Sequence, residues 1–109
     1  MATFIKGDIV VIPFPFSDLS GSKRRPALVL ADLSGNDILL CQITSQHTRD
    51  RFAVPLRNTD FAEGSLPSSS FIRSARIFTG DKTIIVRKTG TVKTAVMNKV
   101  VQNIMDIIR

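Results

Sequence analysis

The sequence predicts a mainly β domain, a small barrel of short strands with one helix at its C-terminal end. Three observations support this fold class. The chain has 109 residues, enough for one domain to bury a core without disulfide or metal staples. Short β-branched runs alternate with breaker-rich separators over most of its length. After Gly90 the apolar residues recur with a helical period instead.

Six short runs are predicted to form the strands, each bounded by Gly, Pro, Ser, Asn or Asp residues. They are Asp8 to Phe14, Pro26 to Ala31, Asp37 to Thr44, Phe52 to Leu56, Ser70 to Ile77 and Thr83 to Arg87. Pro13 and Pro15 cannot donate to a ladder, so the first strand is expected to fray or to lie at an edge of the sheet. No internal repeat or low-complexity segment divides the chain, so residues 1–109 are expected to form one domain.

The final segment is predicted to be an amphipathic helix from about Ala95 to the C-terminus, with Thr94 as its N-cap. Its apolar residues recur at a spacing near 3.6 and form one stripe. These are Val92, Val96, Met97, Val100, Val101, Ile104, Met105 and Ile108. Met97 and Met105 are interpreted as packing residues, and the polar residues between the stripe positions, Asn103 among them, are assigned to the solvent face.

The chain is strongly basic, with 15 Lys and Arg against 9 Asp and Glu, a formal net charge of +6 and an isoelectric point near 10.3. Such a charge attracts polyanions and favours nucleic acid or an acidic protein as the partner. The alternative is that the charge only keeps a small domain in solution.

The sparse titratable residues exclude several kinds of site. His47 is the only histidine, which excludes a pair of catalytic imidazoles and a His-rich metal site. Glu63 is the only glutamate and no paired-carboxylate spacing occurs, so neither a metal nor another cofactor is expected. Cys41 lies within an apolar run and is expected to be a small buried hydrophobe in a reducing compartment. With no signal-peptide pattern and no long apolar run, a cytoplasmic protein without a membrane segment is expected.

Three adjacent cations, Lys23, Arg24 and Arg25, precede the second predicted strand. Pro26 biases Arg25 toward an extended conformation, which sets the direction of its side chain. The planar guanidinium can bind two phosphate oxygens at once, so Arg25 is a candidate phosphate ligand. The alternative is that the three cations form a solvated basic turn.

Thr44 and Ser45 stand where the third predicted strand emerges into a polar loop, so their hydroxyls are able to reach a site. The alternative is that Thr44 is a β-branched strand residue whose hydroxyl closes a turn.

Five short segments carry a resemblance to a known family. They are Gly7-Asp8-Ile9-Val10, Arg25-Pro26 with Ala27-Leu28-Val29-Leu30, Ile43-Thr44-Ser45, Ser70-Phe71-Ile72-Arg73, and Lys88-Thr89-Gly90-Thr91-Val92 before the final helix. Over nearly its full length the chain resembles the MazF/PemK family of bacterial toxins, the ribonuclease half of toxin–antitoxin pairs.

The resemblance implies an SH3-like barrel of five to seven strands with a C-terminal helix, assembled as a homodimer. It implies metal-independent cleavage of single-stranded mRNA at short sequences and inhibition by a cognate acidic antitoxin. The family's catalytic arginine falls on Arg25 and its catalytic hydroxyl on Thr44. The expected RNA-binding residues are Phe16, Lys23, Arg24, Ser45, Ser70, Arg73 and Arg76. Phe16 is included because an exposed ring can stack on a base.

Cleavage without a metal or histidine is chemically reasonable, because RNA carries its own nucleophile in the 2′-OH. Two other functions stay open. One is a gyrase-inhibiting toxin of the CcdB type, which acts through a tryptophan-containing tail that this chain lacks. The other is a non-catalytic SH3-like module that only binds RNA. The loop PFPFSDLSGSK is peculiar to this chain, so the RNA target sequence does not transfer from the family.

Overall fold

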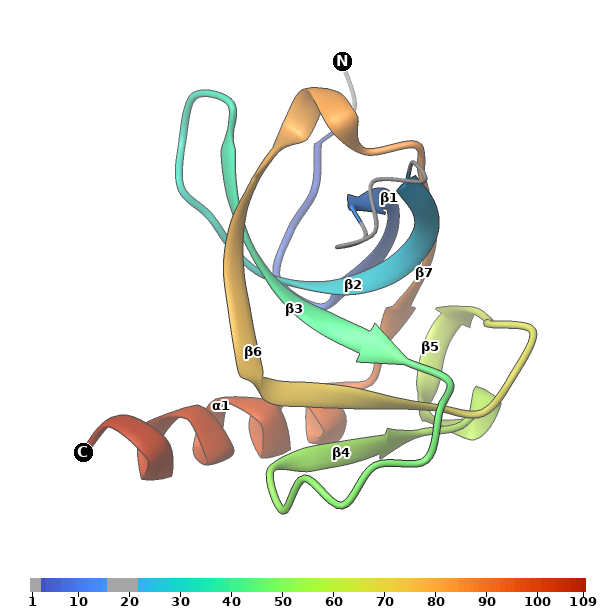
Figure 1. Cartoon of the computed structure of the whole chain (residues 1–109), viewed down its shortest axis with the longest axis vertical. Helices are drawn as coiled ribbons and strands as arrows, with labels where there is room; N and C mark the ends of the chain where they lie inside the picture. The colour runs from blue at the N-terminus through green and yellow to red at the C-terminus, as the bar shows by residue number, and fades with distance from the viewer. Residues whose placement is uncertain (1–2, 16–21) are drawn as a thin grey trace.

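A computed structural model describes residues 3–15 and 22–109 and shows a curled half-barrel of seven antiparallel strands beside one helix (Figure 1). The strands are β1 (Asp8–Pro15), β2 (Ser22–Asp32), β3 (Asp37–Thr44), β4 (Ala53–Leu56), β5 (Phe61–Gly64), β6 (Ser70–Asp81) and β7 (Arg87–Val92). They lie in the order β4-β6-β3-β2-β1-β7-β5. The helix α1 spans Thr94–Ile108. This architecture confirms the expected class, a small SH3-like barrel of five to seven strands with a C-terminal helix.

Most predicted strands are present with shifted ends. The third run, Asp37–Thr44, coincides with β3, whereas β2 begins earlier, at Ser22, and β6 continues to Asp81. The prediction of a strand from Thr83 to Arg87 is wrong, because Lys82–Ile84 form a short 3₁₀ helix and β7 starts only at Arg87. Local hydrogen bonds explain the error: the Asp81 carboxylate accepts from the Thr83 N–H at 2.8 Å and from its hydroxyl at 2.7 Å.

The edge position predicted for the first strand is wrong, because β1 lies between β2 and β7. The prolines still mark a boundary. Residues 8–11 of β1 pair with β7, whereas Pro13 and Pro15 pair with β2 alone among the described residues. The two residues that lack an N–H group therefore lie beyond the part of β1 that pairs with β7.

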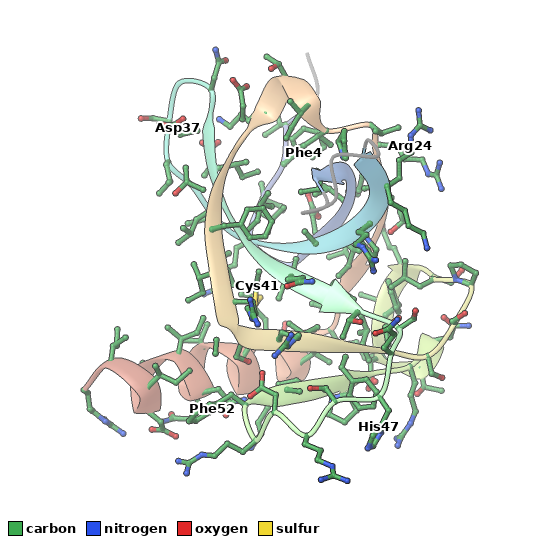
Figure 2. All side chains as sticks on the ribbon, viewed as in Figure 1. Phe4, Arg24, Asp37, Cys41, His47 and Phe52 are labelled. Atoms are coloured by element: carbon green, nitrogen blue, oxygen red, sulfur yellow. The ribbon has the colours of Figure 1, made fainter. Side chains whose placement is uncertain are left out.

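Two apolar clusters occupy the two faces of the sheet, because successive side chains of a strand point to opposite faces. One cluster joins strand residues to the helix and includes Ile9, Leu28, Ile43, Val96 and Val100. The other fills the curl of the sheet and comprises Phe4, Val10, Ile12, Ala27, Val29, Ile38 and Leu40 (Figure 2). Side chains near the strand ends that lie outside both clusters are available to form a functional site.

The helix confirms only part of its predicted pattern. Its N-cap is Lys93 rather than Thr94, and no side chain caps it. Met97 is buried as expected, but Met105 is 42% exposed, because the C-terminal end of α1 extends past the sheet (Figure 1). The described residues include no helix long and apolar enough to cross a membrane.

Asn103 is also placed differently from its prediction, since it is buried and not on the solvent face. Its side-chain amide donates to the Phe52 carbonyl oxygen at 3.2 Å and to the Ser74 hydroxyl at 3.4 Å. These hydrogen bonds satisfy the Asn103 amide and so offset the cost of removing it from water.

Candidate functional site

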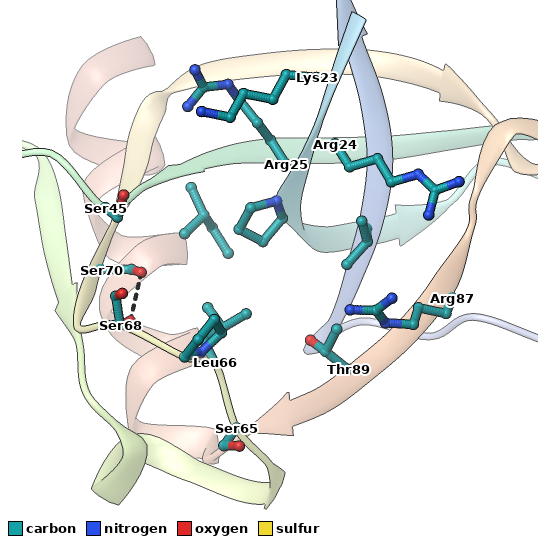
Figure 3. Close-up of a pocket in the computed structure, with 14 residues that line it drawn as sticks. Lys23, Arg24, Arg25, Ser45, Ser65, Leu66, Ser68, Ser70, Arg87 and Thr89 are labelled. Atoms are coloured by element: carbon teal, nitrogen blue, oxygen red, sulfur yellow. Dashed lines mark hydrogen bonds between the residues drawn. The ribbon is translucent and has the colours of Figure 1, made fainter.

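A pocket of about 350 Å³ lies where β1, β2, β3 and β7 meet the segment between β5 and β6 (Figure 3). Its apolar lining consists of Val11, Pro26, Ile43, Leu66 and Pro67. Its cations are Lys23, Arg24, Arg25 and Arg87. Its hydroxyls belong to Ser45, Ser65, Ser68, Ser70 and Thr89. The pocket therefore combines an apolar surface with positive charge and hydrogen-bonding groups.

Strand register places the centre of this pocket. Val11 on β1 lies opposite Pro26 on β2 and opposite Arg87 on β7. Directly opposed residues share a face of a sheet, so these three form a row across three strands. The Val86 N–H donates to the Val11 carbonyl oxygen at 2.8 Å, which fixes the start of β7 beside β1. The row ends in a guanidinium group at its β7 end.

The far wall of the pocket depends on a close approach between β5 and β7. Gly64 has a φ of +74°, and a Cβ there would lie 2.1 Å from the Thr89 carbonyl oxygen. Glycine is therefore required at this position, both for its backbone conformation and for space. This contact brings Ser65 and Leu66 to the pocket beside Thr89 (Figure 3).

The cations of β2 reach the pocket from two sides. Lys23 and Arg25 alternate with Arg24 and Pro26 along the strand, so the two pairs point to opposite faces. In Figure 3 the side chains of Lys23 and Arg25 extend together on one side, and Arg24 lies on the side of Arg87. Lys23 and Arg24 are exposed and Arg25 is half-buried. The structure thus brings all three predicted cations to one pocket and adds a fourth.

Of the predicted serines, both line the pocket. Ser70 is 5% exposed and its hydroxyl donates to the Ser68 carbonyl oxygen at 3.0 Å (Figure 3). That bond holds the turn that enters β6 against the pocket. Ser45 is exposed, directly after the end of β3.

Thr44, the predicted catalytic hydroxyl, is not among the described residues that line this pocket. It is half-buried and lies opposite Phe71 of β6. Its hydroxyl accepts a hydrogen bond from the Gln46 N–H at 3.1 Å. The structure therefore shows the turn-closing role, and the catalytic role of Thr44 stays a prediction.

Two further residues predicted to bind RNA, Arg73 and Arg76, are not among the described residues that line the pocket. Arg73 lies on β6 with its Nε 3.5 Å from the Asp50 carboxylate. Arg76 borders a second pocket of about 400 Å³, together with Ile12, Gln42 and Phe78. Phe16 lies outside the described residues.

Arg87, Thr89 and the serines of the 65–68 segment line the pocket but were not predicted from the sequence as site residues. The adjacent cations Arg87 and Lys88 at the start of the Thr89-Gly90-Thr91-Val92 motif were an available signal. Arg87 and Thr89 both line the pocket, and Thr89 is the extra residue where the register of β7 shifts between its pairs with Val10 and Ile9. The predicted strand ended at Arg87, where the observed strand β7 begins. Arg87 and Thr89 were therefore not recognised as neighbours on one strand.

The remaining reactive groups are separate from the pocket lining. Burial, together with the nearby Asp50 carboxylate, raises the pKa of the Cys41 thiol to about 12, so the thiol is protonated at neutral pH. Its Sγ donates to the Arg73 carbonyl oxygen at 2.8 Å. His47 is exposed and its ring meets that of Phe71 edge to face, with centroids 6.0 Å apart. Within the described residues, no three His, Cys, Asp or Glu side chains are grouped to hold a metal ion.

Several solved structures are similar to this chain in fold. A MazE–MazF structure from Deinococcus radiodurans is similar with a TM-score of 0.80 and 19% identity, covering 99% of this chain and 97% of that one. An endoribonuclease in complex with its cognate antitoxin, from a mycobacterial species, gives a TM-score of 0.76 and 16% identity over 95% and 93% of the two chains. Toxin MazF-mt6 from Mycobacterium tuberculosis gives 0.71 and 17% over 91% and 93%. At such identities the likeness shows the fold alone.

A search of curated proteins gives no matching relative. The sequence does match a family model, that of the PemK-like, MazF-like toxins of type II toxin–antitoxin systems, over residues 5–108. The match includes every pocket residue and both ends of the sheet. The chain therefore belongs to the PemK-like, MazF-like toxin family of type II toxin–antitoxin systems.

Proposed function

We propose that the protein is a metal-independent, sequence-specific endoribonuclease, the toxin of a type II pair, which cleaves single-stranded mRNA in the cytoplasm. The observation that carries this proposal is the convergence of four cations and five hydroxyl side chains on one pocket. Phosphate affinity comes from the cations, and RNA supplies the nucleophile.

In the proposed reaction the ribose 2′-oxygen attacks the adjacent phosphorus atom and the bond to the 5′-oxygen breaks. The products are a 5′-hydroxyl end and a 2′,3′-cyclic phosphate, or the 3′-phosphate formed from it by hydrolysis. The protein has to align the 2′-oxygen and stabilise charge on the phosphoryl oxygens. Arg25 is assigned the second task, because its forked donors can bind two oxygens at once. A guanidinium keeps its proton at any working pH, so the role is electrostatic and not proton transfer.

The second catalytic assignment is the hydroxyl of Thr44, which is proposed to orient the reacting groups from the end of β3. Lys23, Arg24, Ser45 and Ser70 are proposed to bind the RNA around the pocket. Arg73 and Arg76 are proposed to make weaker contacts with more distant phosphates, since both lie on β6 outside this pocket.

The proposed partners follow from the charge. A homodimer, with a mass of about twice 12.0 kDa, would join the basic surfaces of two subunits into a longer RNA groove. An acidic antitoxin segment that orders on binding would occupy the same basic surface and compete with RNA. Sedimentation and a competition assay test these two assignments.

The decisive experiment incubates the pure protein with a long RNA containing paired and unpaired regions, in EDTA, and maps the cut ends. Cuts in unpaired regions with 5′-hydroxyl ends are expected from the wild type and not from Arg25→Ala. Arg109→Gln is the matched control, because Arg109 lies at the far end of α1 with its side chain 66% exposed. Binding without any cleavage would contradict the enzyme and favour the RNA-binding module. Cleavage that requires a divalent metal would contradict the mechanism.

A further inference from the structure

We propose that the β7 side of the pocket reads one guanine base of the target RNA, with Arg87 as the specificity-determining residue. This inference rests on the proposed function and extends it from phosphate binding to base recognition.

The lining of the pocket indicates a flat apolar ligand group beside a charged one. Val11, Ile43 and Leu66 form a nearly buried apolar floor, and the half-buried Pro26 and the exposed Pro67 leave apolar surface that a ligand can cover. A phosphate group alone gains nothing from such a surface, because apolar side chains cannot replace its water. A nucleobase is stabilised by contact with such a surface, because its two faces are apolar and only its edge is polar.

Size and connectivity favour one base. A volume of about 350 Å³ lies at the small end of ligand pockets, which suits a single nucleotide. Lys23 and Arg25 lie on one side of β2, whereas Arg24 lies on the side of Arg87 (Figure 3). Pro26, Val11 and Arg87 form a row on one face, so a base lying over Pro26 and Val11 presents its edge to Arg87.

The polar rim at the end of the row matches guanine. Arg87 is held opposite Val11 by the start of β7, and its exposed guanidinium presents paired donors at the pocket. Guanine offers two adjacent acceptors, O6 and N7, which an arginine fork binds together. Adenine presents a donor at the position of O6 and would leave one arm of the fork without an acceptor.

Thr89 borders the same end of the pocket as Arg87 (Figure 3). Its hydroxyl donates to the Ile9 carbonyl oxygen at 3.4 Å, so the oxygen is left to accept a hydrogen bond from the ligand. The guanine 2-amino and N1–H groups supply such donors.

The test measures base preference and not only activity. Cut sites of the wild type are mapped in a long RNA, and an uncleavable strand with a 2′-deoxy residue at the cut site is used for binding. The strand is made with guanine, 7-deazaguanine or adenine at the position of the guanine that the mapped cut sites share. We expect one required guanine among the mapped sites and a loss of about ten- to one-hundredfold in affinity on replacing guanine by adenine. Replacing guanine by 7-deazaguanine, which lacks N7, should cause a smaller loss of affinity than replacing it by adenine.

The matched variants are Arg87→Gln, Arg87→Lys and the control Arg109→Gln. Arg87→Gln should lose the preference for guanine, because a glutamine amide matches adenine N6 and N7 instead, and Arg87→Lys should retain part of the preference, because its ammonium group can still reach O6 and N7. An unchanged base preference in Arg87→Gln, or a mapped consensus without guanine, would overturn the inference. A reduced salt dependence with unchanged preference would also overturn it, by making Arg87 a phosphate ligand.

The binding arm separates the two proposals. If the wild type cuts no RNA, but binds a uridine strand with one central guanine more tightly than the same strand with adenine there, base reading stands and the proposed nuclease function fails. If the wild type cuts RNA but treats the three strands alike, the nuclease function stands and base reading fails.

Discussion

The hydroxyl of Thr44 accepts a hydrogen bond from the Gln46 N–H at 3.1 Å, and this bond closes the turn at the end of β3. Ser45, the residue enclosed by that turn, lines the pocket that also holds Arg25. Each hydroxyl can therefore be tested for a separate role, one in holding the turn and one at the ligand.

Variants of the two residues should separate these roles. Thr44→Ser keeps the hydroxyl and should cleave RNA at close to the wild-type rate, whereas Thr44→Val keeps the shape and loses the oxygen. Loss of both the turn and the proposed orienting group should slow single-turnover cleavage by Thr44→Val by roughly tenfold or more. Ser45→Ala should weaken binding more than it slows cleavage. A wild-type rate for folded Thr44→Val would leave Thr44 with its turn-closing role alone.

Replacing Arg25 should be the most damaging change to catalysis. Arg25→Ala loses the charge and the fork, and Arg25→Lys keeps only the charge. Removal of a preorganised stabilising donor slows a reaction by roughly a hundred- to a thousandfold, or about 3–4 kcal/mol, and lysine should restore only part of this. Binding of a 2′-deoxy strand should change much less than single-turnover cleavage. Near-wild-type cleavage by folded Arg25→Ala protein would contradict the assigned role.

The salt dependence of RNA binding should distinguish the pocket cations from those on β6. Each phosphate contact with a single strand contributes a slope of roughly −0.7 in log affinity against log salt. Lys23→Ala and Arg24→Ala should each flatten the slope by about one contact. Arg73→Ala and Arg76→Ala should flatten it less, because Arg73 pairs with Asp50 and neither residue lines the pocket. Equal effects of all four would instead indicate a diffuse basic surface.

The sequence was sufficient for parts of the structure whose state is decided locally. Asp37–Thr44 is apolar and bounded by turn residues, so its limits were predicted. Phe61–Gly64 was missed, because only Phe61 is buried and its strand state comes from pairing with distant β7. Asn103 was assigned to solvent because its partners, the Phe52 carbonyl and the Ser74 hydroxyl, belong to other segments.

The same distinction holds for the candidate site. Arg25 and Ser45 were found because the Arg25-Pro26 pair and the strand exit are local signals. Arg87 joins the site only through its register with Val11, which no local pattern contains. Tertiary pairing therefore decides which cations share a pocket, although the sequence shows that cations are available.

The buried carboxylate of Asp8 should be important for stability. It is 1% exposed, accepts hydrogen bonds from the Ile5 N–H and the Thr91 hydroxyl, both at 3.0 Å, and lies 3.6 Å from the Lys88 amine. Asp8→Ala leaves these donors unsatisfied and should lower the free energy of unfolding by about 1–3 kcal/mol. Denaturant unfolding measures the change, with Asp106→Ala, an exposed carboxylate on α1, as the control. Equal stability of the two variants would contradict this account.

Cys41 should make the protein less stable at alkaline pH. In the folded state its pKa is raised from 9.0 to about 12 by burial and by Asp50, so the unfolded chain loses the thiol proton first. Stability from this group is therefore fully present below pH 9 and is lost as the pH rises from 9 toward 12. The free energy of unfolding should fall more steeply between pH 8 and about 10.5 for the wild type than for Cys41→Ala, in which other titrating groups are unchanged. The native thiol should also resist alkylation at pH 9 until denaturant is added. Parallel pH profiles for the two proteins, together with fast native alkylation, would show that Cys41 is neither buried nor shifted in solution.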